Sequence, residues 1–168
     1  MKRLLINFLV LPFLLSLNAC GIYSFTGASI APEIKTISIQ YFTNQATLVQ
    51  PTLSQTLTDA LKDRFMQQTN LSIVNGRGDF NIEGAITNYS TQPVAIQAND
   101  KAALNRLTIT IRVTFTNDKN EKQNFETNFS RYEDYDSSLS LSAVEDNLIK
   151  VISDALVEDI FNKAVVNW

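Results

Sequence analysis

The sequence predicts an α+β fold, a two-layer sandwich in which a four-stranded mixed β-sheet is backed by two helices. Two observations predict it. Some segments alternate apolar and polar residues, as half-buried strands do, and two others carry apolar residues at helical spacing. The elements follow in the order β-α-β-β-β-α, with strands expected over 34–42, 79–90, 104–117 and 123–132. A sheet with one apolar face needs a second layer, which the two helices supply.

The strands differ in how clearly they alternate. In the first strand, Ile37, Ile39 and Tyr41 alternate with polar residues. In the second, Phe80, Ile82, Gly84 and Ile86 share one side. The clearest strand places Leu107, Ile109, Ile111, Val113 and Phe115 on one face and Thr108, Thr110, Arg112, Thr114 and Thr116 on the other. A turn over 117–120 then predicts a hairpin with the last strand, which presents Phe125, Phe129 and Arg131 on one side.

Each predicted helix has a single apolar stripe. The first, over 51–69, begins with Pro51, which suits a first helical turn. Its stripe recurs every four residues, at Leu53, Leu57, Leu61 and Phe65. The second follows a predicted capping box from Ser142 to Glu145, and its stripe is Leu148, Ile149, Ile152, Leu156, Ile160 and Phe161. The acidic run Glu133 to Asp136 is predicted to be a solvated loop before this helix.

The N-terminus has the pattern of a bacterial lipoprotein signal. Lys2 and Arg3 precede a nearly unbroken apolar run over 4–15, which is too short to span a bilayer and has the length of a signal-peptide core. Ala19 stands directly before Cys20, the single cysteine, and Leu17 three residues before it. We therefore expect a signal peptide over 1–19, a lipidated tether over 20–32 that begins with acylated Cys20, and one folded domain over 33–168.

Composition argues against common enzyme chemistry. The chain has no histidine, and acylation of Cys20 leaves no free thiol. Catalytic pairs of the Ser-His and Cys-His kinds and the usual zinc sites are thereby excluded. The full chain has a formal charge of −3, and loss of Lys2 and Arg3 on cleavage makes it −5. An acidic chain is a poor nucleic-acid binder. The prediction is a protein that is not an enzyme, with no cofactor and no metal.

A family resemblance begins at the lipidation site. The stretch CGIYSFTG from Cys20 to Gly27, and PEIKTI from Pro32 to Ile37, resemble the start of the LptE family of lipopolysaccharide-assembly lipoproteins. The predicted order of elements is similar over essentially the whole mature chain. The resemblance implies a lipid-anchored protein of the outer membrane that faces the periplasm. It also implies a role in plugging an LptD-like β-barrel, in assisting its assembly and in binding lipopolysaccharide.

Candidate site residues follow from chemistry. Guanidinium and ammonium groups suit phosphates, so the candidates for lipopolysaccharide binding are Arg77, Lys101, Arg106 and Arg112. The bland alternative is that each is a solvated surface charge. The polar face of strand 104–117 is the candidate for barrel contact, through Thr108, Thr110, Thr114 and Thr116. The competing interpretation is that this face simply meets water.

Two other functional classes stay open. The first is a general periplasm-facing envelope lipoprotein that acts as a binding module in another secretion or surface-structure complex. The second, more distant, is a hydrolase that works with carboxylates alone. Copurification of an outer-membrane barrel would separate the lipopolysaccharide-assembly function from the first alternative, and a pair of carboxylates in a pocket would favour the second.

The lipidation site can be tested directly. We expect Cys20→Ser to leave uncut precursor or a soluble secreted form, because the thiol is the atom that receives the lipid. The measurement is mass spectrometry of the mature N-terminus, with membrane fractionation alongside. A wild-type mature chain that starts at any residue other than Cys20 would contradict the assignment.

Overall fold

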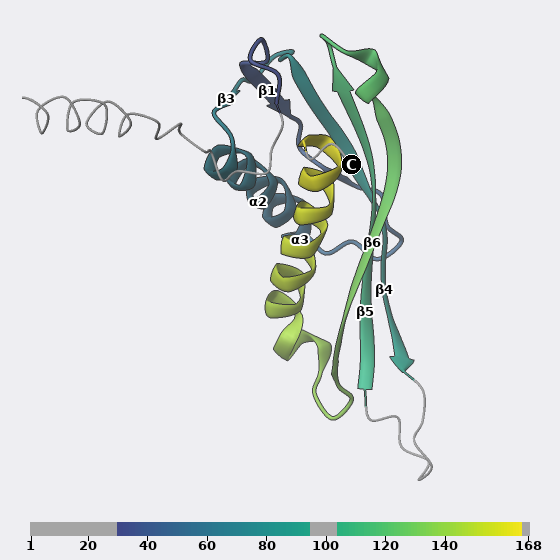
Figure 1. Ribbon diagram of the computed structural model, residues 1–168. Helices are drawn as coiled ribbons and strands as arrows, with labels where there is room; N and C mark the ends of the chain where they lie inside the picture. The colour runs from purple at the N-terminus through teal and green to yellow at the C-terminus, as the bar shows by residue number, and fades with distance from the viewer. Residues whose placement is uncertain (1–29, 95–103, 166–168) are drawn as a thin grey trace, which may run out of the picture.

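The computed structural model describes residues 30–94 and 104–165 (Figure 1). The predicted signal peptide and Cys20 lie outside this part of the chain, as does Lys101. The elements, in chain order, are β1 Thr36–Ile39, β2 Thr43–Asn44, α2 Leu53–Gln68, β3 Ser72–Ile73, β4 Phe80–Val94, β5 Leu104–Asn117, the 3-10 turn η2 Glu121–Gln123, β6 Phe125–Asp136 and α3 Leu141–Val165. In the described ranges, no helix is long and apolar enough to cross a membrane.

The predicted α+β class is confirmed, but the sheet has six strands instead of four. Its order is β3-β1-β4-β5-β6, and β2 also pairs with β4. The contacts of β1 with β3 and β4, and of β2 with β4, are parallel. The long pairs β4–β5 and β5–β6 are antiparallel. The strand β3 occupies only two residues of the apolar stretch 71–74, which is too short to show an alternating pattern.

Of the strand predicted over 34–42, only β1 at Thr36–Ile39 forms, and the separate strand β2 at Thr43–Asn44 lies just beyond the predicted end. Phe42 turns into the core and is fully buried, while Tyr41 is about half exposed, so the expectation that Tyr41 shares the inner face is wrong. The Phe42 N–H donates to Thr58 Oγ1 at 3.2 Å. The ring lies against Gly84, where any Cβ would come within 2.3 Å of a ring carbon. Only glycine leaves room for Phe42 here, and this packing interrupts the strand.

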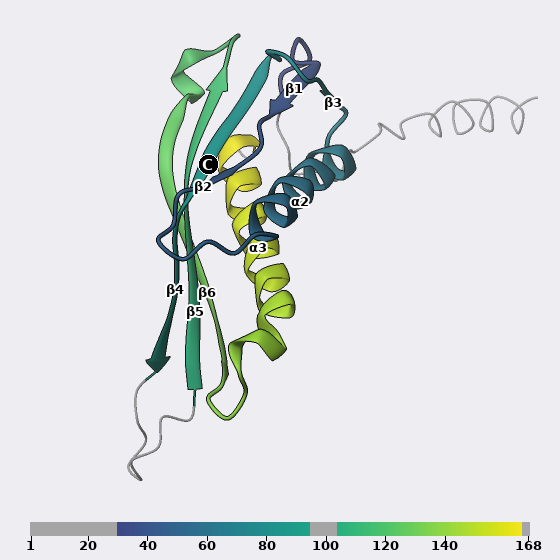
Figure 2. The same ribbon diagram turned by 180° about the vertical axis from the view of Figure 1, so that it is seen from behind.

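Both helices cover the same face of the sheet, which we call the inner face (Figures 1 and 2). The inner-facing residues of β5 are confirmed, since Leu107, Ile109, Ile111, Val113 and Phe115 are at most 1% exposed. The predicted stripes of both helices are buried against them. Phe65 of α2 and Phe161 of α3 pack edge to face with ring centres 5.1 Å apart, so the helices also contact each other.

The helix starts differ from the predictions. The helix α2 begins at Leu53, because the side-chain oxygen of Gln50 accepts hydrogen bonds from the Thr52 and Leu53 N–H groups. The helix α3 begins at Leu141, so the capping box predicted at Ser142 is wrong. Its acidic member, Glu145, instead accepts a hydrogen bond from the hydroxyl of Tyr89 on β4. This contact ties the first turns of α3 to the sheet.

The acidic run Glu133 to Asp136 was predicted as a loop, and this is wrong. It forms the last part of β6, where Tyr135 is buried and Asp134 pairs with a residue of β5. Charge does not prevent strand formation here because alternate side chains point to opposite faces. Arg131, earlier in β6, reaches α3 and bonds both carboxylate oxygens of Asp159 at 2.5 and 2.6 Å.

The carboxylate of Asp79 joins the starts of β1 and β4. It accepts hydrogen bonds from the Lys35 N–H at 2.9 Å, the Thr36 hydroxyl at 2.9 Å and the Thr36 N–H at 3.0 Å. The Thr36 hydroxyl also accepts from the Asp79 N–H at 2.9 Å. These donors stabilise the ionised form and lower the pKa of Asp79 from 3.8 to about 2, the Lys35 N–H contributing most.

We expect Ile111→Asp to destabilise the protein by at least about 4 kcal/mol, because it replaces a fully buried side chain with an unpaired charge. Thr110→Asp is the matched control on the opposite face of β5 and should cost less than about 1 kcal/mol. Thermal and urea unfolding measure both. An unchanged midpoint for Ile111→Asp would show that the inner face has been assigned wrongly.

Asp79 predicts a dependence of stability on pH. Its pKa is lower in the folded chain than in the unfolded chain, so its contribution is fully present above about pH 4. That contribution is lost as the pH falls from about 4 towards 2. We expect Asp79→Asn to flatten the loss of stability in this window, measured as the free energy of unfolding by urea. Asp63→Asn, at an exposed position on α2, is the control, and equal slopes for wild type and Asp79→Asn would refute the assignment.

The polar sheet face as candidate functional site

The face of the sheet turned away from the helices, which we call the outer face, is polar along its length. Alternation along three long strands produces it, because every second side chain of β4, β5 and β6 must point away from the core. Its members are Asn81, Glu83, Ala85, Asn88, Ser90 and Gln92 of β4, Arg106, Thr108, Thr110, Arg112, Thr114 and Thr116 of β5, and Glu126, Asn128, Ser130, Tyr132 and Asp134 of β6. Threonine suits such positions because it combines high strand propensity with a hydroxyl group.

The structure brings the four candidate threonines together in one row along β5. Each is partly buried between its cross-strand neighbours. The Thr110 and Ser130 hydroxyls lie 2.9 Å apart and share a hydrogen bond. Asn88 and Ser130 flank Thr110 on either side in the register. Around Thr108 and Thr110 the outer face is therefore a surface of hydroxyl and amide groups that can donate and accept hydrogen bonds. Further along the row, Arg112 and the two cross-strand neighbours of Thr114, which are Glu83 and Glu126, add charges.

Arg106 lies at one end of this row and is already engaged. Its Nε and Nη2 donate to the two carboxylate oxygens of Asp134 at 2.7 and 2.9 Å. Its guanidinium carbon also stands 3.7 Å from the centre of the Tyr132 ring. The hydrogen bond from Arg106 lowers the pKa of Asp134. A phosphate would have to displace Asp134 to receive both donors.

Arg77 is not on the sheet. It follows β3 and bonds both oxygens of Asp118 at 2.7 Å, across the turn after β5. That bond lowers the pKa of the Asp118 carboxyl group. Arg77 lines a depression of about 370 Å³ at the β1 end of the sheet, together with Asn81, Glu83 and Thr116. Glu83 also lies there, so the depression is lined by both positively and negatively charged side chains.

Arg112 is the least constrained of the described candidates. Its one ion pair is with Glu126 at 3.9 Å, and its side chain is 49% exposed. It lies six residues from Arg106 along β5, which is about 20 Å in an extended strand. Arg77, Arg106 and Arg112 therefore form no single cluster, and Lys101 lies outside the described residues.

The described ranges offer no metal site, since no three His, Cys, Asp or Glu side chains gather in them.

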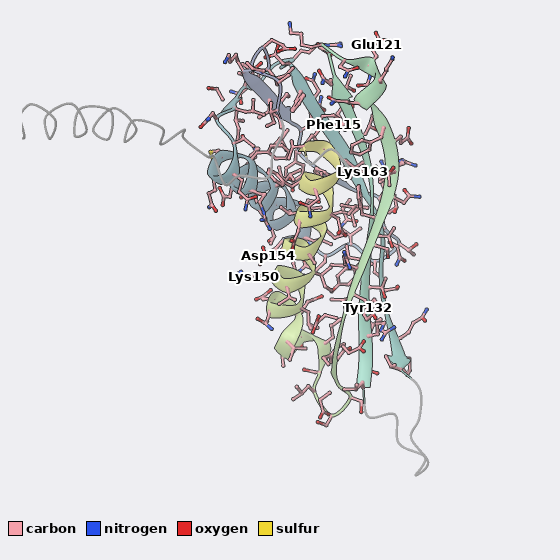
Figure 3. All side chains as sticks on the ribbon, in the orientation of Figure 1. Phe115, Glu121, Tyr132, Lys150, Asp154 and Lys163 are labelled. Carbon is pink, nitrogen blue, oxygen red and sulfur yellow. The ribbon has the colours of Figure 1, made fainter. Side chains whose placement is uncertain are left out.

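A second charged region lies between the helices, where Lys150 and Asp154 of α3 form a 3.1 Å ion pair. Both lie on the side of α3 away from the sheet (Figure 3). The burial of Tyr89, reinforced by its hydrogen bond to Glu145, raises the pKa of the Tyr89 hydroxyl, so the phenol keeps its proton at physiological pH.

Sequence reasoning missed the flanking parts of the outer face. Asn88, Ser90 and Gln92 of β4, with Asn128 and Ser130 of β6, complete the polar surface around the threonines. Their signal was the alternation already seen in the two neighbouring strands, applied to polar residues as well as apolar ones. The carboxylates that engage the arginines, Asp118 and Asp134, could not be assigned because those pairings depend on strand register.

Comparison with known proteins gives the family from a family model and the fold from solved structures. The LptE family model, described as lipopolysaccharide-assembly, matches residues 34–164. No curated protein matches significantly. A minor lipoprotein from Acinetobacter baumannii is 13% identical, with 77% of this chain and 91% of that one covered and a TM-score of 0.50. Rare lipoprotein B from Shewanella oneidensis is 15% identical, with 76% and 92% covered and a TM-score of 0.51.

A hypothetical protein from Chlamydia trachomatis is 6% identical, with 80% of this chain and 99% of that chain covered and a TM-score of 0.56. At such identities the likeness to solved structures shows the fold alone. The family model carries more, because it spans nearly all of the described chain and matches both helices and every strand. This chain therefore belongs to the LptE family of lipopolysaccharide-assembly proteins.

Proposed function

We propose that this protein is the lipoprotein subunit of a lipopolysaccharide translocon, anchored by Cys20 in the outer membrane and facing the periplasm. In this role it occupies the lumen of an LptD-like β-barrel and assists its assembly. It acts by binding and by occupying space, without catalysis. The family assignment supports a role in lipopolysaccharide assembly, and the barrel partner and the membrane location are parts of the proposal.

The part of the outer face around Thr108 and Thr110, which is rich in hydroxyl and amide groups, is the observation that carries the barrel contact. The lumen of a large membrane barrel is polar, so a domain inside it needs hydrogen-bonding groups more than apolar area. The row Thr108, Thr110, Thr114 and Thr116 supplies them on a rigid strand. Tyr132, opposite Thr108, is exposed, but its neighbours on this face are polar or charged, so the face presents no large apolar patch before the protein meets the barrel.

Lipopolysaccharide contact is the second part of the proposal, and Arg112 is its best-placed residue. Its guanidinium is half exposed beside the threonine row and holds Glu126 only at 3.9 Å. A phosphate can therefore bind it without breaking a short ion pair. Arg77 and Arg106 contribute only if a phosphate replaces Asp118 or Asp134, and Lys101 remains a candidate on its charge alone.

Photo-crosslinkers at Thr110 and Thr114 test the proposal in living cells. We expect crosslinks to a large outer-membrane barrel, because both positions face outward at the centre of the contact surface. A crosslinker at Lys150, whose side chain is 72% exposed on the helix side, is the matched control. The same reagent at Arg112 reports lipopolysaccharide contact.

Depletion of the protein completes this test. We expect a poorly assembled barrel and an outer membrane that is more permeable to large or apolar antibiotics. If Thr110 and Thr114 crosslink only to a small periplasmic protein, and barrel assembly is normal after depletion, the proposal is wrong. The protein would then be a binding module of another envelope complex.

A further inference from the structure

The strand β4 has an edge that is half occupied. Its first part pairs with β1 at 80–82 and with β2 at 85–86, while β5 lies along its other side. Beyond Asn88, the described residues provide a neighbour only on the β5 side. Figure 2 shows this lower part of β4 at the border of the sheet, below the point where β2 leaves it.

The backbone groups on this free edge can be identified from the pairing. The Gln40 N–H donates to the Ile82 carbonyl at 2.9 Å and the Gln45 N–H to the Ile86 carbonyl at 2.8 Å. These carbonyls therefore point away from β5. A bulge between Ile86 and Asn88 shifts the register by one residue. Alternation then makes Tyr89 and Thr91 the residues whose N–H and C=O groups point outward.

This free edge lacks one of the usual protections against strand pairing, a charged side chain. Natural edge strands are guarded by charged side chains, proline or bulges. The opposite edge of the sheet, β6, is guarded in this way, with charges at Glu126, Arg131, Glu133, Asp134 and Asp136. The free part of β4 has no charge between Asn88 and Val94, and its proline, Pro93, comes only near the end. The five residues from Asn88 to Gln92, which lie between the bulge and Pro93, are thus open to a short partner strand.

The loop next to this edge is also uncharged, and it holds two apolar side chains outward. Leu48 and Val49 are 60% and 63% exposed. Hydrogen bonds fix both ends of the loop, since the Ala46 N–H donates to Asn44 Oδ1 at 3.0 Å and Asn44 Nδ2 to the Gln50 carbonyl at 3.4 Å. Such a braced loop costs little entropy on binding. It follows β2 directly, and therefore lies where the free edge begins (Figures 1 and 2).

We propose that the β4 edge from Asn88 to Gln92 receives an extended, uncharged segment of the barrel partner, which pairs with Tyr89 and Thr91 and packs on Leu48 and Val49. The proposal rests on the proposed function for the identity of the partner. Unpaired backbone groups are satisfied best by another backbone, and strand addition of this kind is a common mode of recognition. The strands of a closed barrel have no free edge, so the segment comes from outside its closed sheet.

The test removes one outward N–H group. Thr91 is exposed, and proline there takes away the donor and blocks a neighbouring strand without breaking the β4–β5 ladder. We expect Thr91→Pro to lower recovery of the barrel from detergent-solubilised outer membranes about tenfold, as loss of a backbone contact implies. Thr91→Ala keeps the N–H group and should recover the barrel fully.

Amide hydrogen exchange of the wild-type complex gives a second readout that needs no variant. We expect exchange at Thr91 to slow about tenfold or more in the complex relative to the free lipoprotein. Full recovery with folded Thr91→Pro, or unchanged exchange at Thr91, would overturn strand addition while the barrel contact stands. Protection at Thr91 in the free lipoprotein that grows with its concentration would also overturn it, in favour of a second copy. Absence of a barrel from the wild-type pull-down would instead refute the proposed function.

Discussion

Burial of one face of β5 is the constraint on which the rest of the structure depends. This strand pairs along its length with β4 on one side and β6 on the other, and its five inner side chains lose nearly all contact with water. Complete burial of an aliphatic or aromatic side chain contributes roughly 1.5–3 kcal/mol. Since the side-chain period of a strand is two, fixing Ile111 inward fixes Thr110 and Arg112 outward. The polar outer face is therefore a consequence of the core.

Strong periodicity explains what the sequence predicts well. The alternation from Leu107 to Phe115 and the stripes of both helices involve many residues each, so a single exception does not hide the pattern. The prediction fails where one tertiary contact overrides the local pattern. Phe42 breaks the first strand because Gly84 leaves room for its ring, and Glu145 abandons the predicted cap for Tyr89. These contacts join residues more than 40 positions apart.

The candidate site was predictable in kind and less so in detail. The outward direction of the threonine side chains follows directly from the alternation in β5. The state of each arginine does not, because Arg106 meets Asp134 across a strand pair and Arg77 meets Asp118 across a turn. From the sequence alone, these arginines are equivalent candidates for binding a phosphate. In the structure, carboxylates bind Arg77 and Arg106 at hydrogen-bonding distance, whereas Arg112 has only a 3.9 Å ion pair. An anion that binds to Arg77 or Arg106 must compensate for the free energy of the ion pair that it breaks.

The bulge between Ile86 and Asn88 changes which residues of β4, the even-numbered or the odd-numbered, face the helices. Before it, even-numbered residues face the helices, and after it odd-numbered residues do, as the buried Ile82 and Tyr89 show. Thr87 is the extra residue, because Ile86 and Asn88 stand opposite Ile111 and Thr110, which are neighbours on β5. Deletion of Thr87 would leave a regular ladder in which Ile86 and Tyr89 both still face the helices. The effect of the bulge is therefore on the backbone, which it bends and twists just where β2 leaves β4.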